Sequence, residues 1–198
     1  MKLDLVHDIQ TVYRQTLDSM SRPGLIRNLR DQVSKMKIEV GCYGSTFLLA
    51  LMLFDTEVKF KVCSEDEAEI TKLINQLTYA KVTELESADY ILILKDAKAE
   101  DLELAIKRAY SGDLLDPHKA ATIIIEADAV NNERNLTLRG PGIEKVHYID
   151  VKPSDRWVDL RAEKNSEYPL GIDLIFTDRD DNLLCLPRTT QILKQVVG

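Results

Sequence analysis

Three short segments, far apart in the sequence, carry residue types that bind small anions. They are Ser21–Gly24, Gly140–Gly142 and Pro187–Thr190. Guanidinium groups, hydroxyl groups and free backbone N–H groups are the donors that grip phosphate and carboxylate. Together the segments predict an anion-binding cradle, whose residues would be Arg22, Gly24, Gly140, Gly142, Arg188, Thr189 and Thr190.

A structural explanation of the same residues stays open. Both arginines could pair with some of the 33 acidic residues, and Thr189 and Thr190 could cap a last helix. If the two arginine-bearing segments converge, the two guanidinium groups repel each other unless an anion or an acid lies between them. Asp173 is the nearest internal acid in sequence, and its pairing with an arginine is the favoured version.

The last part of the chain, "YPLGIDLIFTDRDDNLLCLPRTT" from Tyr168 to Thr190, is typical of two apolar strands around an acidic turn. The residues at the two ends of this hairpin do not favour strand formation. Gly171 packs no side chain, and Asp173 is a charge inside an apolar run. We therefore interpret Gly171 and Asp173 as a structural motif that holds the hairpin to a particular shape.

Other candidate sites are weaker. None of the three histidines has a second ligand two or four residues away, so no metal site is indicated, and His147 is expected at the surface of a strand. The acidic run from Asp178 to Asn182 suggests a calcium loop, but Leu183 and Thr189 stand where that loop needs glycine and glutamate. A solvated turn is the better interpretation.

Alternating helical and strand patterns surround these segments. Apolar spacing predicts helices over 4–20, 45–54, 64–77, 99–112 and 153–165, with Ser45 and the Ser64–Glu67 capping box as N-terminal signals, Pro153 in the first turn of the last and Gly112 as a stop. Strands are predicted over 56–63, 88–95, 120–130, 135–140 and 145–151, with a polar loop at 131–135. Interleaved helices and strands favour a layered α/β fold.

Composition limits the class of protein. A chain of 198 residues with 44% hydrophobic and 30% charged residues is expected to be a single globular domain over 1–198. The formal net charge of −7 argues against a nucleic-acid or membrane-surface binder. The start, "MKLDLVHDIQ", has no apolar signal region, and the three cysteines form no CxxC pair. We expect a cytoplasmic protein.

Four motifs in order resemble one known family. They are "VHDIQTVYRQTLDSMSRPG", "LRGPGI", "YPLGIDLIF" and "LPRTT". The chain resembles the H subunit of the carbon–phosphorus lyase system of bacterial phosphonate metabolism, from about residue 6 to residue 190. Each motif alone is weak, but four at matching separations make the resemblance fairly specific.

The resemblance implies a fold and a setting. The fold would be a three-layer α/β/α arrangement with a mixed sheet, similar to the large domain of type I pyridoxal-phosphate-dependent transferases. The chain would form a homodimer and join the G, I and J subunits in a transferase assembly. That assembly converts ATP and an alkylphosphonate into ribose 1-alkylphosphonate 5-triphosphate and adenine.

No lysine falls in a segment that matches a Schiff-base role, so we expect no cofactor. The nucleosidase step is attributed to the I subunit of the family's assembly, and the H subunit has no assigned chemical step. Three functions stay open: an accessory subunit, which is favoured; a stand-alone anion-binding domain or enzyme that uses the cradle; and a purely structural dimerisation module.

Overall fold

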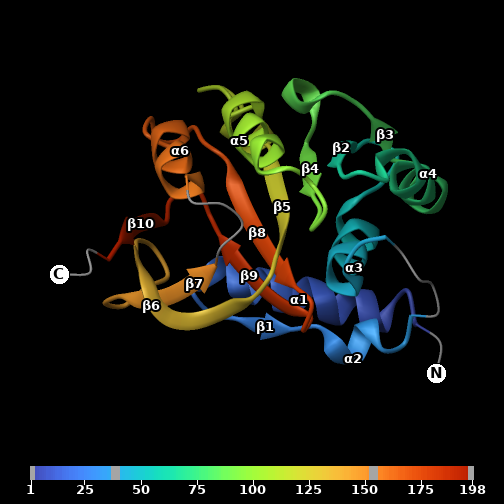
Figure 1. Cartoon of the computed structure of the whole chain (residues 1–198), viewed down its shortest axis with the longest axis horizontal. Coiled ribbons are helices and arrows are strands. Elements are labelled where there is room, and N and C mark those ends of the chain that lie inside the picture. The colour runs from blue at the N-terminus through green and yellow to red at the C-terminus, as the bar shows by residue number, and fades with distance from the viewer. Residues whose placement is uncertain (1–2, 37–40, 152–155, 196–198) are drawn as a thin grey trace.

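A computed structural model describes residues 3–36, 41–151 and 156–195 (Figure 1). Its helices are α1 (His7–Ser21), α2 (Arg30–Val33), α3 (Gly44–Leu53), α4 (Glu67–Thr78), α5 (Ala99–Arg108) and α6 (Trp157–Lys164), with 3₁₀ turns η1 (Leu85–Ser87) and η2 (Pro117–Lys119). Its strands are β1 (Arg27–Asn28), β2 (Lys59–Cys63), β3 (Lys81–Val82), β4 (Tyr90–Ile93), β5 (Thr122–Ala127), β6 (Val130–Arg139), β7 (His147–Val151), β8 (Asp173–Asp178), β9 (Asn182–Leu186) and β10 (Gln191–Lys194).

The main sheet has seven strands in the order β1-β9-β8-β5-β4-β2-β3. Neighbouring strands pair in parallel along β3-β2-β4-β5-β8. Strand β9 runs antiparallel to both of its neighbours, β8 and β1. A second, antiparallel sheet has the order β10-β6-β7. The predicted α/β class with a mixed sheet is therefore confirmed.

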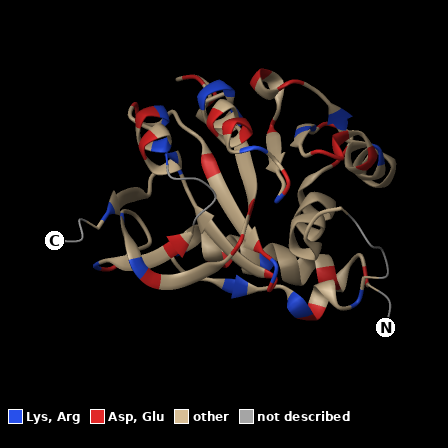
Figure 2. Cartoon of the chain, in the orientation of Figure 1, with Lys and Arg blue, Asp and Glu red and all other residues tan. Residues whose placement is uncertain are grey.

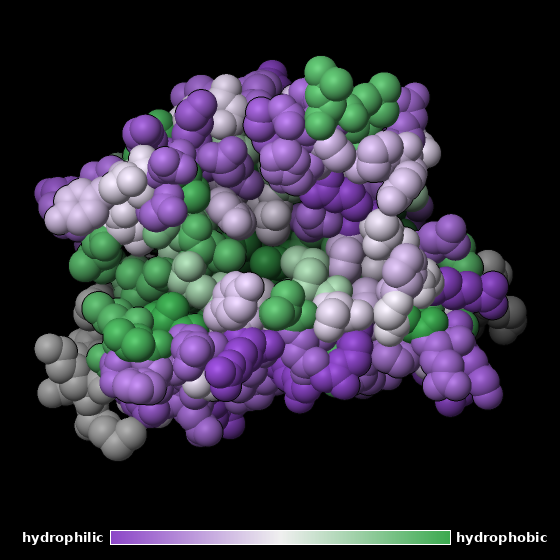
Figure 3. Space-filling model, turned by 180° about the vertical axis from the view of Figure 1, so that it is seen from behind, coloured by the Kyte–Doolittle hydropathy of each residue, from purple (hydrophilic) through white to green (hydrophobic). Residues whose placement is uncertain are grey.

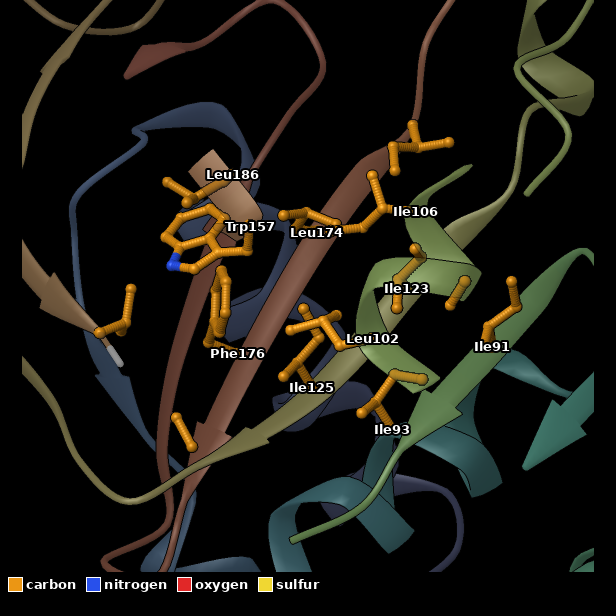
Figure 4. Packing of buried hydrophobic residues seen from close by; sticks show 14 of the residues in the cluster. Ile91, Ile93, Leu102, Ile106, Ile123, Ile125, Trp157, Leu174, Phe176 and Leu186 are labelled. Carbon is orange, nitrogen blue, oxygen red and sulfur yellow. The ribbon is translucent and has the colours of Figure 1, made fainter. Parts of the chain in front are cut away.

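Helices cover both faces of the main sheet because its central strands are apolar on both faces. On one face, Ile91, Ile123, Leu174 and their neighbours pack against α5, α6 and the smaller sheet. Figure 4 shows this cluster, in which the rings of Trp157 and Phe176 meet edge to face with centroids 5.1 Å apart. The alternate residues of the same strands face α1, α3 and α4. The result is three layers.

Charged residues lie mainly outside this core. Figure 2 shows acidic and basic residues on the helices and loops, with the central strands almost free of them. Within the described residues, no helix combines the length and the apolar character that crossing a bilayer would require.

The predicted helices are present, but the residues predicted to cap or stop them are not at the helix ends. Ser45 is not the N-cap of α3, which is Tyr43, and the buried Ser45 hydroxyl has no partner. The predicted capping box at Ser64 is wrong, because Ser64 Oγ donates to Asp96 Oδ2 at 2.8 Å and α4 starts after Asp66. Only Ser64 therefore has a competing partner, a carboxylate from the segment after β4. Helix α5 ends at Arg108, before the predicted stop at Gly112.

Two strand predictions also change. The polar stretch 131–135 is not a loop but part of β6, with an irregularity in the β6–β7 register between Asn131 and Leu136. Residues 132–135 have no partner on β7, because Asn131 pairs with Asp150 and Leu136 pairs with the adjacent Ile149, so the polar stretch forms an irregularity inside the strand. No last helix follows Thr190, because the chain continues as β10 paired with β6, so the helix-cap explanation of Thr189 and Thr190 is wrong. Pro153 lies outside the described residues.

Candidate functional site

The three segments with anion-binding residue types do come together in the backbone. Gly142 has φ +80°, and a Cβ there would collide with the carbonyl oxygen of Ser21. Gly140 has φ +136°, and a Cβ there would lie 2.9 Å from the carbonyl oxygen of Thr189. Glycine permits both the left-handed backbone and the close approach. The turn after β6 therefore lies between the first segment and the last.

The first segment is also joined to the smaller sheet. A Cβ at Gly24 would lie 2.6 Å from Cβ of His147, and Nδ1 of His147 lies 2.8 Å from the carbonyl oxygen of Pro23. Asn132 Nδ2 donates to the carbonyl oxygen of Gly24 at 3.1 Å. His147 is half-buried, so it is only in part the surface histidine that the sequence predicted.

Arg22 pairs within its own helix. Its guanidinium group binds Asp18 one turn earlier on α1, and Asp18 also binds Arg27. The Arg22 side chain is 54% exposed. Arg22 and Arg188 therefore bind different carboxylates, although the backbone segments that carry them both touch the same glycine turn.

Arg188 is held by Asp173, as the structural version of the sequence hypothesis expected. Nη2 of Arg188 donates to Asp173 Oδ2 at 2.6 Å, and the backbone N–H of Arg188 donates to Oδ1 at 2.6 Å. Nη1 donates to the carbonyl oxygen of Pro117 at 2.6 Å. The two side chains are 16% and 19% exposed. This ion pair closes the open end of the β8–β9 hairpin.

Gly171 is positioned by Asn165, a residue that the sequence patterns did not single out. The backbone N–H of Ile172 donates to Asn165 Oδ1 at 2.8 Å, and Asn165 Nδ2 donates to the carbonyl oxygen of Ile172 at 3.0 Å. A Cβ at Gly171 would lie 2.6 Å from Asn165 Oδ1. Asn165 ends α6, so it joins this helix to the start of β8.

Arg161 is the other residue that sequence reasoning missed. It is 2% exposed, and its Nη1 and Nη2 donate to the carbonyl oxygens of Thr190 and Pro187 at 2.9 and 2.6 Å. Burial lowers the pKa of Arg161 to about 10, an effect that Asp173 opposes. One signal could have found it. Arg161 follows Trp157 by four residues, so it shares the apolar face of its helix.

These residues line a pocket of about 630 Å³ between α6, β10 and the glycine turn. Its polar lining includes Arg161, Asn165, Arg188, Thr189 and Thr190, and Pro141 comes from the glycine turn. Figure 1 shows α6 and β10 on the same side of the molecule, next to β6. Of the residues predicted for the cradle, Arg188, Thr189 and Thr190 line this pocket, and Arg22, Gly24, Gly140 and Gly142 do not.

The opposite end of the hairpin is closed. Asp178 is 1% exposed and accepts hydrogen bonds from the backbone N–H groups of Val130, Asp180 and Asn182, and from Asn182 Nδ2. The expected solvated turn is therefore wrong at Asp178, whose carboxylate organises the turn. Within the described residues, no group of three His, Cys, Asp or Glu side chains could hold a metal ion.

The chain is similar to known proteins along nearly its whole length. Residues 3–193 match the family described as "Bacterial phosphonate metabolism protein (PhnH)". Alpha-D-ribose 1-methylphosphonate 5-triphosphate synthase subunit PhnH of Rhizobium meliloti (strain 1021) is 28% identical over 97% of this chain and 94% of that protein. A candidate C-P lyase subunit protein of Stutzerimonas stutzeri, HtxG, is 27% identical over 92% of this chain and 85% of that protein. The chain therefore belongs to the PhnH family of bacterial phosphonate metabolism proteins.

Proposed function

We propose that this chain is an accessory subunit of a carbon–phosphorus lyase assembly in phosphonate catabolism. The observation that carries the proposal is the family match over residues 3–193, together with a relative named as a subunit of a ribose 1-methylphosphonate 5-triphosphate synthase. In that assembly ATP and an alkylphosphonate yield ribose 1-alkylphosphonate 5-triphosphate and adenine. The chain would be required for this reaction without performing it alone.

The state of the thiols supports an accessory role. All three cysteines are buried, and burial raises the pKa of Cys42 to about 12, of Cys63 to about 11 and of Cys185 to about 12. Because the thiolate is the reactive form, these side chains are poor nucleophiles at neutral pH.

The proposed setting is a cytoplasmic homodimer that also contacts the G, I and J subunits. The apolar surface supports a protein partner. Figure 3 shows an apolar area on the back of the molecule. In α3, Leu51, Met52 and Leu53 are only half-buried. Light scattering at micromolar concentration should give twice the chain mass, and a monomer would contradict the homodimer.

Finer features of the fold belong to the same proposal. Residues 1–198 would form one domain, built like the large domain of type I pyridoxal-phosphate-dependent transferases but acting without that cofactor. Helices on both faces of a mixed seven-stranded sheet are consistent with it. Added pyridoxal phosphate should form no stable yellow internal aldimine.

Reconstitution tests the accessory role. The G, I and J subunits would be incubated with ATP and methylphosphonate, with and without this chain, and adenine release would be followed by chromatography. Release is expected only when this chain is present, and none is expected from this chain by itself. Turnover by the isolated chain would favour a stand-alone enzyme, and full turnover without it would remove the proposed requirement.

A further inference from the structure

Strand β10 forms an open edge of the smaller sheet. In the described part of the chain it pairs with β6 on one side and with no strand on the other. The backbone N–H of Gln195 donates to the carbonyl oxygen of Asn135, and successive residues of a strand point their backbone groups alternately to its two sides. The N–H and carbonyl groups of Ile192 and Lys194 therefore point away from β6.

The contact between α6 and β10 agrees with this assignment of the outward groups. Thr190 lies two residues before Ile192, and its carbonyl oxygen accepts from Arg161 Nη1 at 2.9 Å. Arg161 thus takes the place that an N–H group of a neighbouring strand would take. Among residues 3–36, 41–151 and 156–195, no group is hydrogen-bonded to the outward backbone groups of Ile192 and Lys194. Helix α6 therefore satisfies only the start of this edge.

The open edge borders the groove between β10 and α6. This groove is the pocket of about 630 Å³, and it is lined by Ile192 and Leu193 on one side and by Val158 and Ala162 on the other. A strand with unpaired backbone groups is a template for another extended chain, which adds to it as a further strand. The apolar walls would contact alternate side chains of that added strand.

The charge of the groove selects the kind of segment. Arg161 and Arg188 line the groove and no acidic side chain of the described residues does, although the whole chain has a net charge of −7. Asp173 neutralises Arg188, so the excess positive charge comes from Arg161, whose Nη atoms donate only to carbonyl oxygens. Complementary charge across an interface favours the right partner and suppresses wrong ones. An acidic segment therefore fits best.

We propose that β10 binds an extended acidic segment of a partner protein, which pairs with Ile192 and Lys194 as an additional strand and packs apolar side chains against Val158 and Ala162. The inference goes beyond the accessory role, because it states a binding mode that this chain carries alone. It is tested on the isolated chain, so it can fail while the assembly turns over, and the reverse also holds.

Fluorescence anisotropy on the full chain tests the site with a labelled octapeptide of alternating valine and glutamate. This peptide should bind, and the alternating valine and lysine peptide should bind about tenfold more weakly or worse. No binding of the glutamate peptide at millimolar concentration would overturn the site. Equal affinity for the lysine peptide would overturn the acidic occupant.

The same glutamate peptide with methylated backbone nitrogens tests the strand pairing without any change to the protein. It has lost the N–H groups that an added strand donates, so it should not bind. Binding of the methylated peptide with normal affinity would show that the groove does not use backbone pairing, and would overturn the proposal.

The variant Lys194→Pro removes one outward N–H group from the edge. Pairing with β6 should persist, because this N–H points away from β6 and proline is tolerated on edge strands. Affinity for the glutamate peptide should fall about tenfold or more. Lys194→Ala is the matched control, since it also loses the ion pair with Asp159 but keeps the N–H group. Equal affinities of the two variants would contradict pairing at Lys194.

A second copy of the chain is the competing occupant of this edge. If the β10 strands of two copies paired, Lys194→Pro would lower the mass in light scattering and Lys194→Ala would not. We expect the same mass for both variants and for the unchanged protein. A lower mass for Lys194→Pro alone would overturn the choice of a partner segment. Urea unfolding checks that both variants are folded, and the methylated peptide decides if Lys194→Pro is not.

Discussion

The two ends of the β8–β9 hairpin differ in how completely their buried polar groups are hydrogen-bonded within the chain. At the turn, the Asp178 carboxylate is buried and accepts four hydrogen bonds. At the open end, Asp173 neutralises Arg188, but Arg161 and the Thr190 hydroxyl keep unpartnered donors. The Asp178 carboxylate is thus satisfied within the chain, whereas two buried donors near the open end are not. A pocket next to a charge is informative only when the chain does not already satisfy that charge.

The largest expected effect tests the closed end. The substitution Asp178→Ala leaves one buried and three partly buried donors unpaired and should lower the free energy of unfolding by about 3–4 kcal/mol. Asp180→Ala is the control in the same turn, because Asp180 is 66% exposed and its pair with Arg30 contributes little. Urea unfolding measures both. Equal effects of the two variants would show that Asp178 does not organise the turn.

The next effect concerns the open end. Asp173→Asn breaks a largely buried ion pair and should lower the free energy of unfolding by about 2–3 kcal/mol, less than for a fully buried pair. A cycle with Arg188→Met should show strong coupling between the two positions. Asp159→Asn, whose pair with Lys194 is exposed, is the control and should change little. Additive effects at positions 173 and 188 would contradict the pairing.

A pH-dependent effect is expected beside the turn end, where Glu126 pairs in register with Thr177. Burial raises the pKa of Glu126 above its usual 4.5, although hydrogen bonds from Tyr43 and Lys95 oppose this. The folded state therefore binds the proton more tightly than the unfolded state. The stabilisation that protonated Glu126 gives to the folded state is full below about pH 4.5 and is lost as pH rises through the raised pKa.

Replacing this carboxyl group by an amide should remove its contribution to the pH dependence of stability. The free energy of unfolding of Glu126→Gln, relative to the unchanged protein, should increase between about pH 4 and about pH 8. Urea unfolding at each pH measures the difference. A difference that stays constant with pH, or decreases, would contradict the assigned shift.

The smallest effect concerns Arg22, one of the two arginines of the predicted cradle. Arg22→Ala removes a surface ion pair and should change the free energy of unfolding by about 0.5 kcal/mol. Arg188→Met, which breaks the largely buried pair with Asp173, is the comparison and should have the larger effect. Urea unfolding measures both, and equal effects would contradict the difference in burial between the two pairs.

Local patterns predicted much of this molecule. The apolar periods of 4–20 and 45–54 correspond to α1 and α3, and the buried runs at 88–95 and 120–130 contain β4 and β5. Period and burial are properties of a segment, so they can be read without knowing its neighbours. The glycine turn at 140–142 was equally readable, because few residues other than glycine permit its backbone.

The sequence by itself determined the layered α/β class, the family resemblance and the position of the glycine turn. Only the tertiary structure decided which arginine is neutralised and which is not. Arg22 has Asp18 one helical turn away, Arg188 has Asp173 across the hairpin, and Arg161 faces carbonyl oxygens of a distant segment. The physical reason is that a buried charge depends on whatever lies across from it, and contacts between distant residues are not encoded in local spacing.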